Sequence, residues 1–207
     1  MTDSPTPKRA TCGACLRAQS ACICHFAAPL ASCVELLVLQ HPLEVANAKN
    51  SARLLHLSLP NSTLAVGEQF EPDALSRLLH EAGRVPVLLY PATPGDAALG
   101  IAPSPQPAPG LLDELSRLRL VVVDATWRKS RKMLYLNPLL QQLPRLALRD
   151  MPASAYRIRK AHAPDQLSTL EASAYALMQL EGNEARYRPL LAAFDGFVAQ
   201  QAAFVRA

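Results

Sequence analysis

Apolar runs alternate with amphipathic segments along most of the chain. Runs rich in Val and Leu predict buried strands at 33–40, 62–67, 85–90 and 118–124, with a shorter one at 144–149. Helical periodicity falls between and after them, at 45–59, 72–82, 111–118 and 126–136, and in two further segments that end the chain. Strands that alternate with helices are typical of a parallel sheet covered on both faces. We therefore predict an α/β fold, with a parallel sheet flanked by helices.

Capping residues mark the two C-terminal helices. Ser168 and Glu171 have the spacing of a capping box, Gly182 suits a helix stop, and Asn183 suits the next N-cap. These signals give Ser168, Thr169 and Glu171 a structural rather than a catalytic interpretation.

Two segments lack this periodicity. Residues 1–30 form a cysteine-rich head, which we separate from a main domain at 31–207. Residues 91–110 hold six prolines and three glycines, so we expect an irregular surface excursion there. It is either an insertion or an ordered loop beside the functional site.

Composition excludes several classes of protein. Hydrophobic residues make up 50% of the 207 residues and charged residues 18%, which is typical of a globular chain and not of a disordered one. No apolar run approaches the roughly 20 residues that span a bilayer, and the first residues lack the apolar core of a secretory signal. We therefore expect a cytoplasmic protein without a membrane segment, whose five cysteines serve metal binding or catalysis rather than disulfides. The sequence gives no indication of the oligomeric state.

Positive charge is concentrated in one stretch. The whole chain carries +4, but the 33 residues from Arg128 to Lys160 contain nine basic residues and one acid, Asp150, and carry +8. Such a block suits nucleic acid or another phosphorylated ligand. The alternative is that these basic residues lie on solvated helix faces or in ion pairs, but the one acid in the stretch could pair with few of them.

Four cysteines in the head have the spacing C-x2-C-x6-C-x-C: Cys12, Cys15, Cys22 and Cys24. Four thiolates can complete the tetrahedron of a structural zinc site, so we favour zinc. An iron–sulfur cluster, a redox pair and coincidental thiols are the alternatives. His25 could replace one ligand, and Cys33, at the start of a predicted strand, is expected in the core.

Polar residues follow the predicted strands where each one ends. They are Gln40, His41 and Glu44, then Gly67 and Glu68, then Tyr90 and Pro91, and finally Asp124, Thr126 and Trp127. In a parallel α/β sheet, ligands bind beyond the carboxyl ends of the strands, so these groups should converge on one crevice. The chain has no glycine-rich dinucleotide fingerprint and no P-loop. It also lacks the paired carboxylates with which a phosphohydrolase would hold magnesium.

Three of these residues have competing interpretations. Asp124 ends a buried strand, where a carboxylate can have a raised pKa and act as a base, but it could equally cap the next helix. His41 is a second candidate base or a residue that orients the turn before Pro42. Trp127 either anchors the core or stacks on a base.

The motifs together resemble the DTW-domain family. Residues 124–127 read D-A-T-W, and the basic segment RKSRKML follows them. The stretch QHPLE at 40–44, with Asn47, Asn50, Ser51 and Ala52 downstream, is similar to the first motif of that family. YRIRK at 156–160 with LSTLEA at 167–172 is similar to the last, and the cysteine head is similar to that of bacterial members. The resemblance runs from about residue 12 to the end.

This resemblance implies a SPOUT-related α/β fold that binds S-adenosylmethionine. It also implies transfer of the 3-amino-3-carboxypropyl group of that donor to N3 of a tRNA uridine, with release of methylthioadenosine. The alternatives are a SPOUT-like RNA methyltransferase and a non-catalytic, zinc-containing RNA-binding protein.

Site residues are assigned on these grounds. The catalytic candidates are Asp124 and His41. The candidates for binding S-adenosylmethionine are Gln40, Glu44, Glu68, Thr126 and Trp127. The candidates for binding tRNA are Arg128, Lys129, Arg131, Lys132, Tyr156, Arg157, Arg159 and Lys160.

Overall fold

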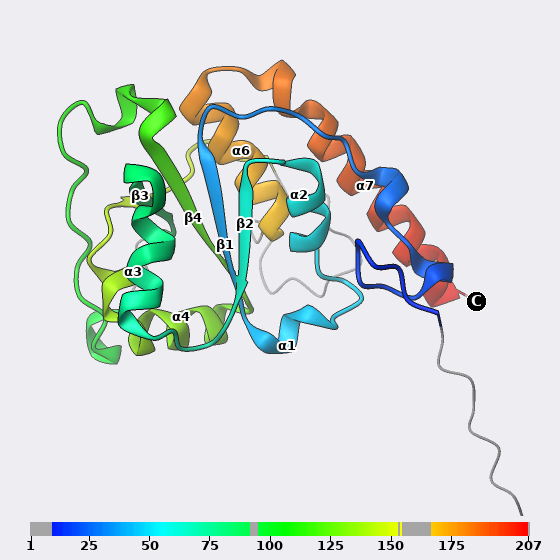
Figure 1. Ribbon diagram of the computed structural model, residues 1–207, viewed down its shortest axis with the longest axis horizontal. Helices are drawn as coiled ribbons and strands as arrows, with labels where there is room; N and C mark the ends of the chain where they lie inside the picture. Colours follow the sequence, from blue (N-terminus) through cyan, green and yellow to red (C-terminus); the bar gives the residue numbers. More distant parts are fainter. Residues whose placement is uncertain (1–9, 92–94, 153, 155–166, 207) are drawn as a thin grey trace, which may run out of the picture.

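A computed structural model describes residues 10–91, 95–152, 154 and 167–206. Its centre is a five-stranded sheet in the order β2-β1-β4-β3-β5, and every neighbouring pair is parallel (Figure 1). The strands are β1 (Glu35–Gln40), β2 (Ser62–Val66), β3 (Val85–Leu89), β4 (Leu118–Asp124) and the short β5 (Arg145–Leu146). The predicted α/β fold with a parallel sheet is confirmed, and each strand lies within its predicted range.

Helices connect and cover the strands. They are α1 (Pro42–Val45), α2 (Ala52–Ser58), α3 (Pro72–His80), α4 (Trp127–Leu136), α5 (Pro138–Gln141), α6 (Thr169–Glu181) and α7 (Glu184–Arg206). The single helix predicted at 45–59 is wrong, because an irregular loop separates α1 from α2. The helix predicted at 111–118 is also wrong: Glu114, with φ −98° and ψ 63°, interrupts the segment, which forms two short 3-10 turns instead.

The two faces of the sheet have separate hydrophobic cores. Leu36 and Val38 of β1 pack with α2, α6 and α7, whereas Leu37 and Leu39 pack with α3, α4 and α5. This split follows from the alternation of side chains along a strand. None of the helices in the described part of the chain is both long and apolar enough to cross a membrane.

The predicted caps of the C-terminal helices are confirmed. The Ser168 hydroxyl accepts from the Glu171 N–H at 3.1 Å, and the Glu171 carboxylate accepts from the Ser168 N–H at 2.7 Å. Helix α6 ends at Gly182, whose φ of 59° lies in the left-handed region that glycine tolerates. The Asn183 side chain accepts from the Arg186 N–H at 3.1 Å at the start of α7.

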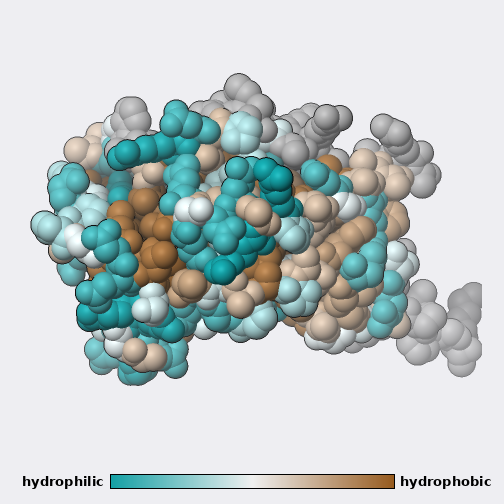
Figure 2. Space-filling model, turned by 90° about the horizontal axis from the view of Figure 1, so that it is seen from above, coloured by the Kyte–Doolittle hydropathy of each residue, from teal (hydrophilic) through white to brown (hydrophobic). Residues whose placement is uncertain are grey.

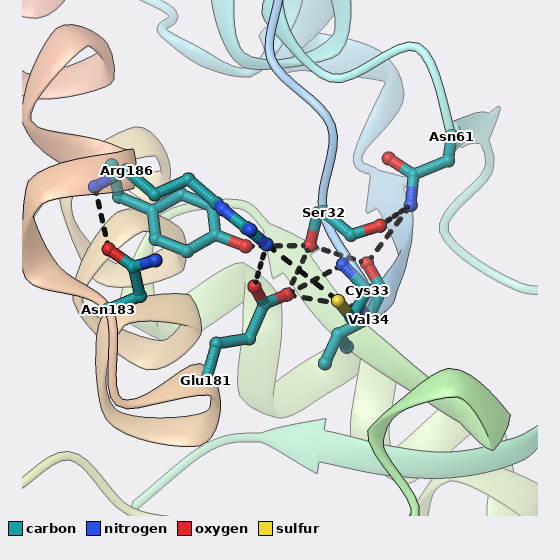
Figure 3. A network of polar contacts seen from close by, with 8 residues as sticks. Ser32, Cys33, Val34, Asn61, Glu181, Asn183 and Arg186 are labelled. Carbon is teal, nitrogen blue, oxygen red and sulfur yellow. Dashed lines mark hydrogen bonds and ion pairs between the residues drawn. The ribbon is translucent and has the colours of Figure 1, made fainter.

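The last residue of α6 ties this helix to the chain entering β1. Oε1 of Glu181 accepts from the Cys33 N–H at 2.8 Å and from the Ser32 hydroxyl at 2.9 Å, and Oε2 pairs with Arg186 at 2.8 Å (Figure 3). Burial acts to raise the pKa of Glu181, but hydrogen bonds from Tyr187, Ser32 and the backbone lower it on balance. The expectation that Cys33 lies in the core is wrong, because β1 begins two residues later and Cys33 is exposed.

The cysteine head packs against α7 and contributes to the core. Ile23 is fully buried and belongs to the same hydrophobic cluster as Phe197 of α7. Gly196 makes room for the ring of Phe26: a Cβ at this position would lie 2.7 Å from Phe26 Cδ1. The head and the main domain are therefore packed together, whichever residue divides them.

The residues predicted to catalyse the reaction or to bind the donor follow the carboxyl ends of the strands, and these ends lie at the bottom of Figure 1. Figure 2 shows the opposite end of the molecule, where hydrophilic residues surround a recess of hydrophobic ones.

Candidate functional site

The site begins where β1 and β4 end side by side. Gln40 and Asp124 are the last residues of these strands and are partners in the parallel register. Strand β1 connects outward to β2, whereas β4 connects through α4 to β5 at the other edge. The connections thus leave in opposite directions, which places the usual binding crevice of an open α/β sheet at this point.

Asp124 is a buried carboxylate with three hydrogen-bond donors. Its side chain points to the α6 face of the sheet, and the residue is 4% exposed. Oδ2 accepts from Gln40 Nε2 at 2.8 Å and from Asn50 Nδ2 at 2.6 Å, and Oδ1 accepts from the Thr169 hydroxyl at 2.6 Å. Burial raises the pKa of Asp124 although these three bonds oppose the shift.

The capping interpretation of Asp124 is wrong, because Thr126 occupies the N-cap position of α4 and no side chain makes a capping hydrogen bond there. The donors to Asp124 come from three separate elements, namely β1, the loop before α2, and the first turn of α6. Thr169 begins α6 as predicted, and its hydroxyl also donates to Asp124 directly. Its position at a helix start was the only sequence signal, and that signal also fits a cap.

A small polar pocket of about 110 Å³ opens beside Asp124. Its polar lining comes from Glu44, Asn47, Lys49, Asn50, Ser51, Asp124, Thr126, Ser168 and Thr169. Glu44 is buried and paired with Lys129 at 3.0 Å, and it accepts from Asn47 Nδ2 at 2.8 Å. The structure therefore brings the predicted residues Glu44, Asp124 and Thr126 together.

A larger, mainly apolar cavity of about 440 Å³ adjoins this pocket. Its lining includes Leu89, Tyr90, Pro91, Val122, Val123, Trp127, Ser130, Leu146, Leu148, Met151 and Leu167. Both hollows share Ala125, Ser168 and Thr169 in their walls, so they lie side by side. Among these lining residues, the sequence analysis names Tyr90, Pro91, Trp127, Ser168 and Thr169. Nothing in the sequence marks the others as part of a site.

Trp127 lies in the wall of the large cavity and not in the core. It is 41% exposed and meets the ring of Tyr90 edge-on, with ring centroids 5.6 Å apart. The Tyr90 hydroxyl lies 3.0 Å from that of Ser130, and burial raises the pKa of Tyr90. The core-anchor interpretation of Trp127 is therefore wrong, and its indole face is available to a ligand.

His41 lies outside both hollows. Its Nδ1 accepts from the Leu43 N–H at 3.1 Å as the N-cap of α1, and its Nε2 lies 3.1 Å from Glu68 Oε1. Hydrogen bonds from Lys132 and His41 lower the pKa of Glu68. The His41 imidazole thus contacts Glu68, while the His41 N–H donates to the Asp124 carbonyl at 3.0 Å. Of the predicted donor-binding residues, Gln40 contacts the Asp124 carboxylate directly.

Acids from other segments pair with part of the basic stretch. Lys129 pairs with Glu44, Lys132 with Glu68 at 2.9 Å, and both Arg131 and Arg145 with Asp96. The acids in these pairs lie outside residues 128–160, so the charge count of that stretch does not include them. Arg128 is exposed at the start of α4. The other predicted RNA-binding residues, namely Tyr156, Arg157, Arg159 and Lys160, lie outside the described residues.

The four head cysteines converge as predicted. All their sulfurs lie within 4.8 Å of one another, with Cys12 and Cys24 3.6 Å apart and Cys15 and Cys22 3.8 Å apart. A tetrahedral zinc with Zn–S bonds of about 2.3 Å requires sulfurs about 3.8 Å apart. The cluster therefore has the size and the donor set of a metal site.

The pKa values of these thiols differ. Backbone N–H groups of Cys15 and Ala14 lower the pKa of Cys12 to about 6, whereas burial and the neighbouring thiols raise that of Cys24 to about 12. A divalent cation among the sulfurs would favour the thiolate form of each.

Comparison with known proteins shows which family this chain resembles. The DTW domain model matches residues 9–202. A tRNA-uridine aminocarboxypropyltransferase 2 of Macaca fascicularis is 30% identical over 200 residues, which are 91% of this chain and 63% of that protein. The Mus musculus protein of the same name is 29% identical over 196 residues, 89% of this chain and 62% of its own.

A relative from a plant has a related name. The tRNA-uridine aminocarboxypropyltransferase A of Arabidopsis thaliana is 31% identical over 135 residues, 61% of this chain and 50% of that protein. The chain thus spans less than two thirds of the length of these curated relatives. No solved structure matches it significantly. With the family model covering nearly the whole chain, this protein belongs to the DTW-domain family.

Proposed function

We propose that this protein is a tRNA-uridine aminocarboxypropyltransferase. It would move the 3-amino-3-carboxypropyl group of S-adenosylmethionine to N3 of a tRNA uridine and release methylthioadenosine. The names of the relatives support the reaction class. The observation that carries the proposal within this chain is the pair of adjoining hollows at the ends of β3 and β4, an apolar cavity beside a polar pocket with a buried carboxylate.

The two hollows suit the two halves of the donor. The apolar cavity, with Trp127 and Tyr90 in its wall, suits the adenosine. The polar pocket has Glu44 and Lys49 in its lining, and these opposite charges suit the amino and carboxylate groups of the methionine moiety. The carbon chain between the two halves would then pass close to Asp124.

Group transfer needs an aligned nucleophile and a proton acceptor. The N3 lone pair of uridine attacks the γ-carbon of the donor, the bond from that carbon to sulfur breaks, and its electron pair stays on sulfur. Asp124 takes the N3 proton, and its raised pKa suits this role because the carboxylate accepts a proton more readily. Gln40, Asn50 and Thr169 hold the carboxylate in place.

The tRNA would approach along the exposed start of α4. Arg128 lies next to Trp127 and, unlike Lys129 and Lys132, forms no ion pair with any of the residues that the structure describes. Because phosphate contacts supply most nucleic-acid affinity, Arg128 and residues 156–160 are our main candidates for tRNA binding, with Lys129, Arg131 and Lys132 contributing when their acidic partners yield.

The head would hold one structural zinc ion on Cys12, Cys15, Cys22 and Cys24. Four protein sulfurs leave no open position for substrate, which favours a structural role. Elemental analysis of the purified protein should give one zinc per chain, and an iron–sulfur cluster would show itself by visible absorbance.

A double-label transfer assay tests the proposed reaction. Unmodified tRNA is incubated with S-adenosylmethionine labelled either in the methyl group or in the carboxyl carbon. Carboxyl label in the tRNA without methyl label is the expected result. Methyl label alone would indicate an RNA methyltransferase, and tRNA binding without transfer of either label would favour a non-catalytic RNA-binding protein.

A further inference from the structure

Arg17 connects the cysteine cluster to the loop that holds Asp124. It lies in the head between Cys15 and Cys22, and its guanidinium crosses to the loop between α1 and α2. Nη1 donates to the Ala48 carbonyl at 2.7 Å, and Nη2 donates to the Asn50 carbonyl at 2.9 Å. The ring of Phe197 lies beneath the guanidinium, 5.0 Å from its centre.

The position of Arg17 depends on the cysteine turn. The Cys12 N–H donates to the Arg17 carbonyl at 2.7 Å, and the Leu16 N–H donates to the Cys12 carbonyl at 2.9 Å. Leu16 has a φ of 60°, a strained value for a branched side chain, so the surrounding contacts must impose this turn. A metal ion on the four sulfurs would fix the same turn from its other side.

The loop that Arg17 contacts also holds the Asp124 carboxylate, which takes the proton in the proposed reaction. Asn50 Nδ2 donates to Asp124 Oδ2 at 2.6 Å, and Asn50 Oδ1 accepts from Gln40 Nε2 at 3.2 Å. The loop that carries Asn50 is neither helix nor strand, so side-chain contacts such as those of Arg17 contribute to its position. The same loop supplies Asn47, Lys49 and Asn50 to the wall of the polar pocket.

We propose that Arg17 is a positioning residue through which metal occupancy of the head sets the geometry of the Asp124 pocket. The metal then serves turnover as well as folding of the head. This inference rests on the proposed function only for its kinetic consequence, because the link from the head to the loop can be measured without any reaction.

Arg17→Lys is the decisive variant. Lysine keeps the charge but offers one compact ammonium in place of a planar fork that spans two carbonyls. A small misplacement of a reacting group can cost about 10²-fold in rate, so we expect kcat about ten- to a hundred-fold lower with a smaller change in the KM for tRNA. If Arg17 merely attracted RNA by its charge, lysine would restore activity.

Hydrogen exchange provides the readout that needs no activity. Amides of the loop at 47–51 should exchange faster in Arg17→Lys than in the wild type, while zinc content and melting temperature stay close to wild type. Arg188→Lys is the matched control, because Arg188 is an exposed arginine paired only with Glu184 on its own helix among the contacts described.

Removing the metal tests the link from the other end. Chelation of the wild-type protein should raise exchange at 47–51, and addition of Zn²⁺ should reverse this. In Arg17→Lys the same chelation should change the loop much less, because the connection is already broken. Equal effects of chelation in both proteins, or unchanged exchange and kcat in Arg17→Lys, would overturn the proposal. If chelation affects the loop as expected but no label is transferred to tRNA, the link stands and the proposed reaction fails.

Discussion

Replacing Asp124 by asparagine separates chemistry from folding at this site. An asparagine oxygen at the Oδ2 position keeps the bonds from Gln40 and Asn50, and its NH2 group then faces the Thr169 hydroxyl, which can turn to accept. The side chain has almost the same shape, so the variant should fold.

The expected magnitudes follow from these three bonds. A hydrogen bond to a charged group contributes about 1.5–3 kcal/mol and a neutral one about 0.5–1.5, so loss of the charge should weaken the three bonds by about 3–4.5 kcal/mol in total. Because the pKa of Asp124 is raised, burial costs the carboxylate more than these three bonds return, so removing the charge should not lower the free energy of unfolding at neutral pH. Loss of the general base should lower turnover by ~10²–10⁴-fold.

The pH dependence gives an independent check. Because the pKa of Asp124 is raised in the folded state, the folded protein binds more protons than the unfolded one between the ordinary aspartate pKa of about 3.9 and the raised value. The contribution of Asp124 to stability therefore falls as the pH rises through this window. The unfolding free energy of wild type minus that of Asp124→Asn should decrease over the same range.

The assay combines single-turnover transfer of carboxyl label with urea unfolding at several pH values. Asp195→Asn is the control, because it removes an exposed carboxylate from α7. Wild-type turnover in Asp124→Asn would refute the general-base role, and an unfolding difference that is flat with pH would refute the inference that burial raises this pKa.

Four further predictions concern the rest of the chain. Trp127→Ala should weaken binding of S-adenosylmethionine, measured by calorimetry, but cost less than about 2 kcal/mol of stability because the side chain is 41% exposed; unchanged affinity would remove Trp127 from the donor site. Gly196→Ala should lower the melting temperature despite a helix-propensity gain of about 1 kcal/mol, because the added Cβ would lie 2.7 Å from Phe26 Cδ1. Gly13→Ala is the control, because a Cβ at that position would meet no atom within 4 Å. Glu181→Gln should lower the free energy of unfolding by about 1–3 kcal/mol at neutral pH. Because the pKa of Glu181 is lowered in the folded state, the difference in unfolding free energy between wild type and variant should shrink as the pH falls below about 4. A pH-independent difference would contradict this. Cys22→Ser should lower the zinc content and expose the head to proteolysis, and full zinc retention in that variant would exclude Cys22 as a ligand.

Residues whose roles depend on near neighbours were predicted well from the sequence. The capping box at Ser168 and Glu171 and the stop at Gly182 are confirmed, because each needs only a few adjacent residues. Convergence of the four cysteines is likewise a matter of short spacing. Placement of Asp124 at a strand end followed from the apolar run before it.

Contacts with distant partners were predicted poorly. Thr169 was explained by its helix start alone, yet it lies 45 positions from Asp124 and donates to it. The local contact of His41, between Nδ1 and the Leu43 N–H, fits the predicted orientation of the turn before Pro42, whereas its contact with Glu68, 27 positions away, was not predicted. The acids that pair with Lys129 and Lys132 come from segments more than 60 residues away.

The sequence by itself determined the elements, their alternation and the end of the sheet at which polar groups gather, because hydrophobic periodicity and strand direction are local properties. Only the tertiary structure decided which polar side chains meet. The strand order β2-β1-β4-β3-β5 brings Gln40 beside Asp124, and the packing of α6 and the head adds Thr169 and Arg17. Hydrogen bonds depend on distances of a few tenths of an ångström between atoms far apart in the chain, and those distances are fixed only when the layers pack.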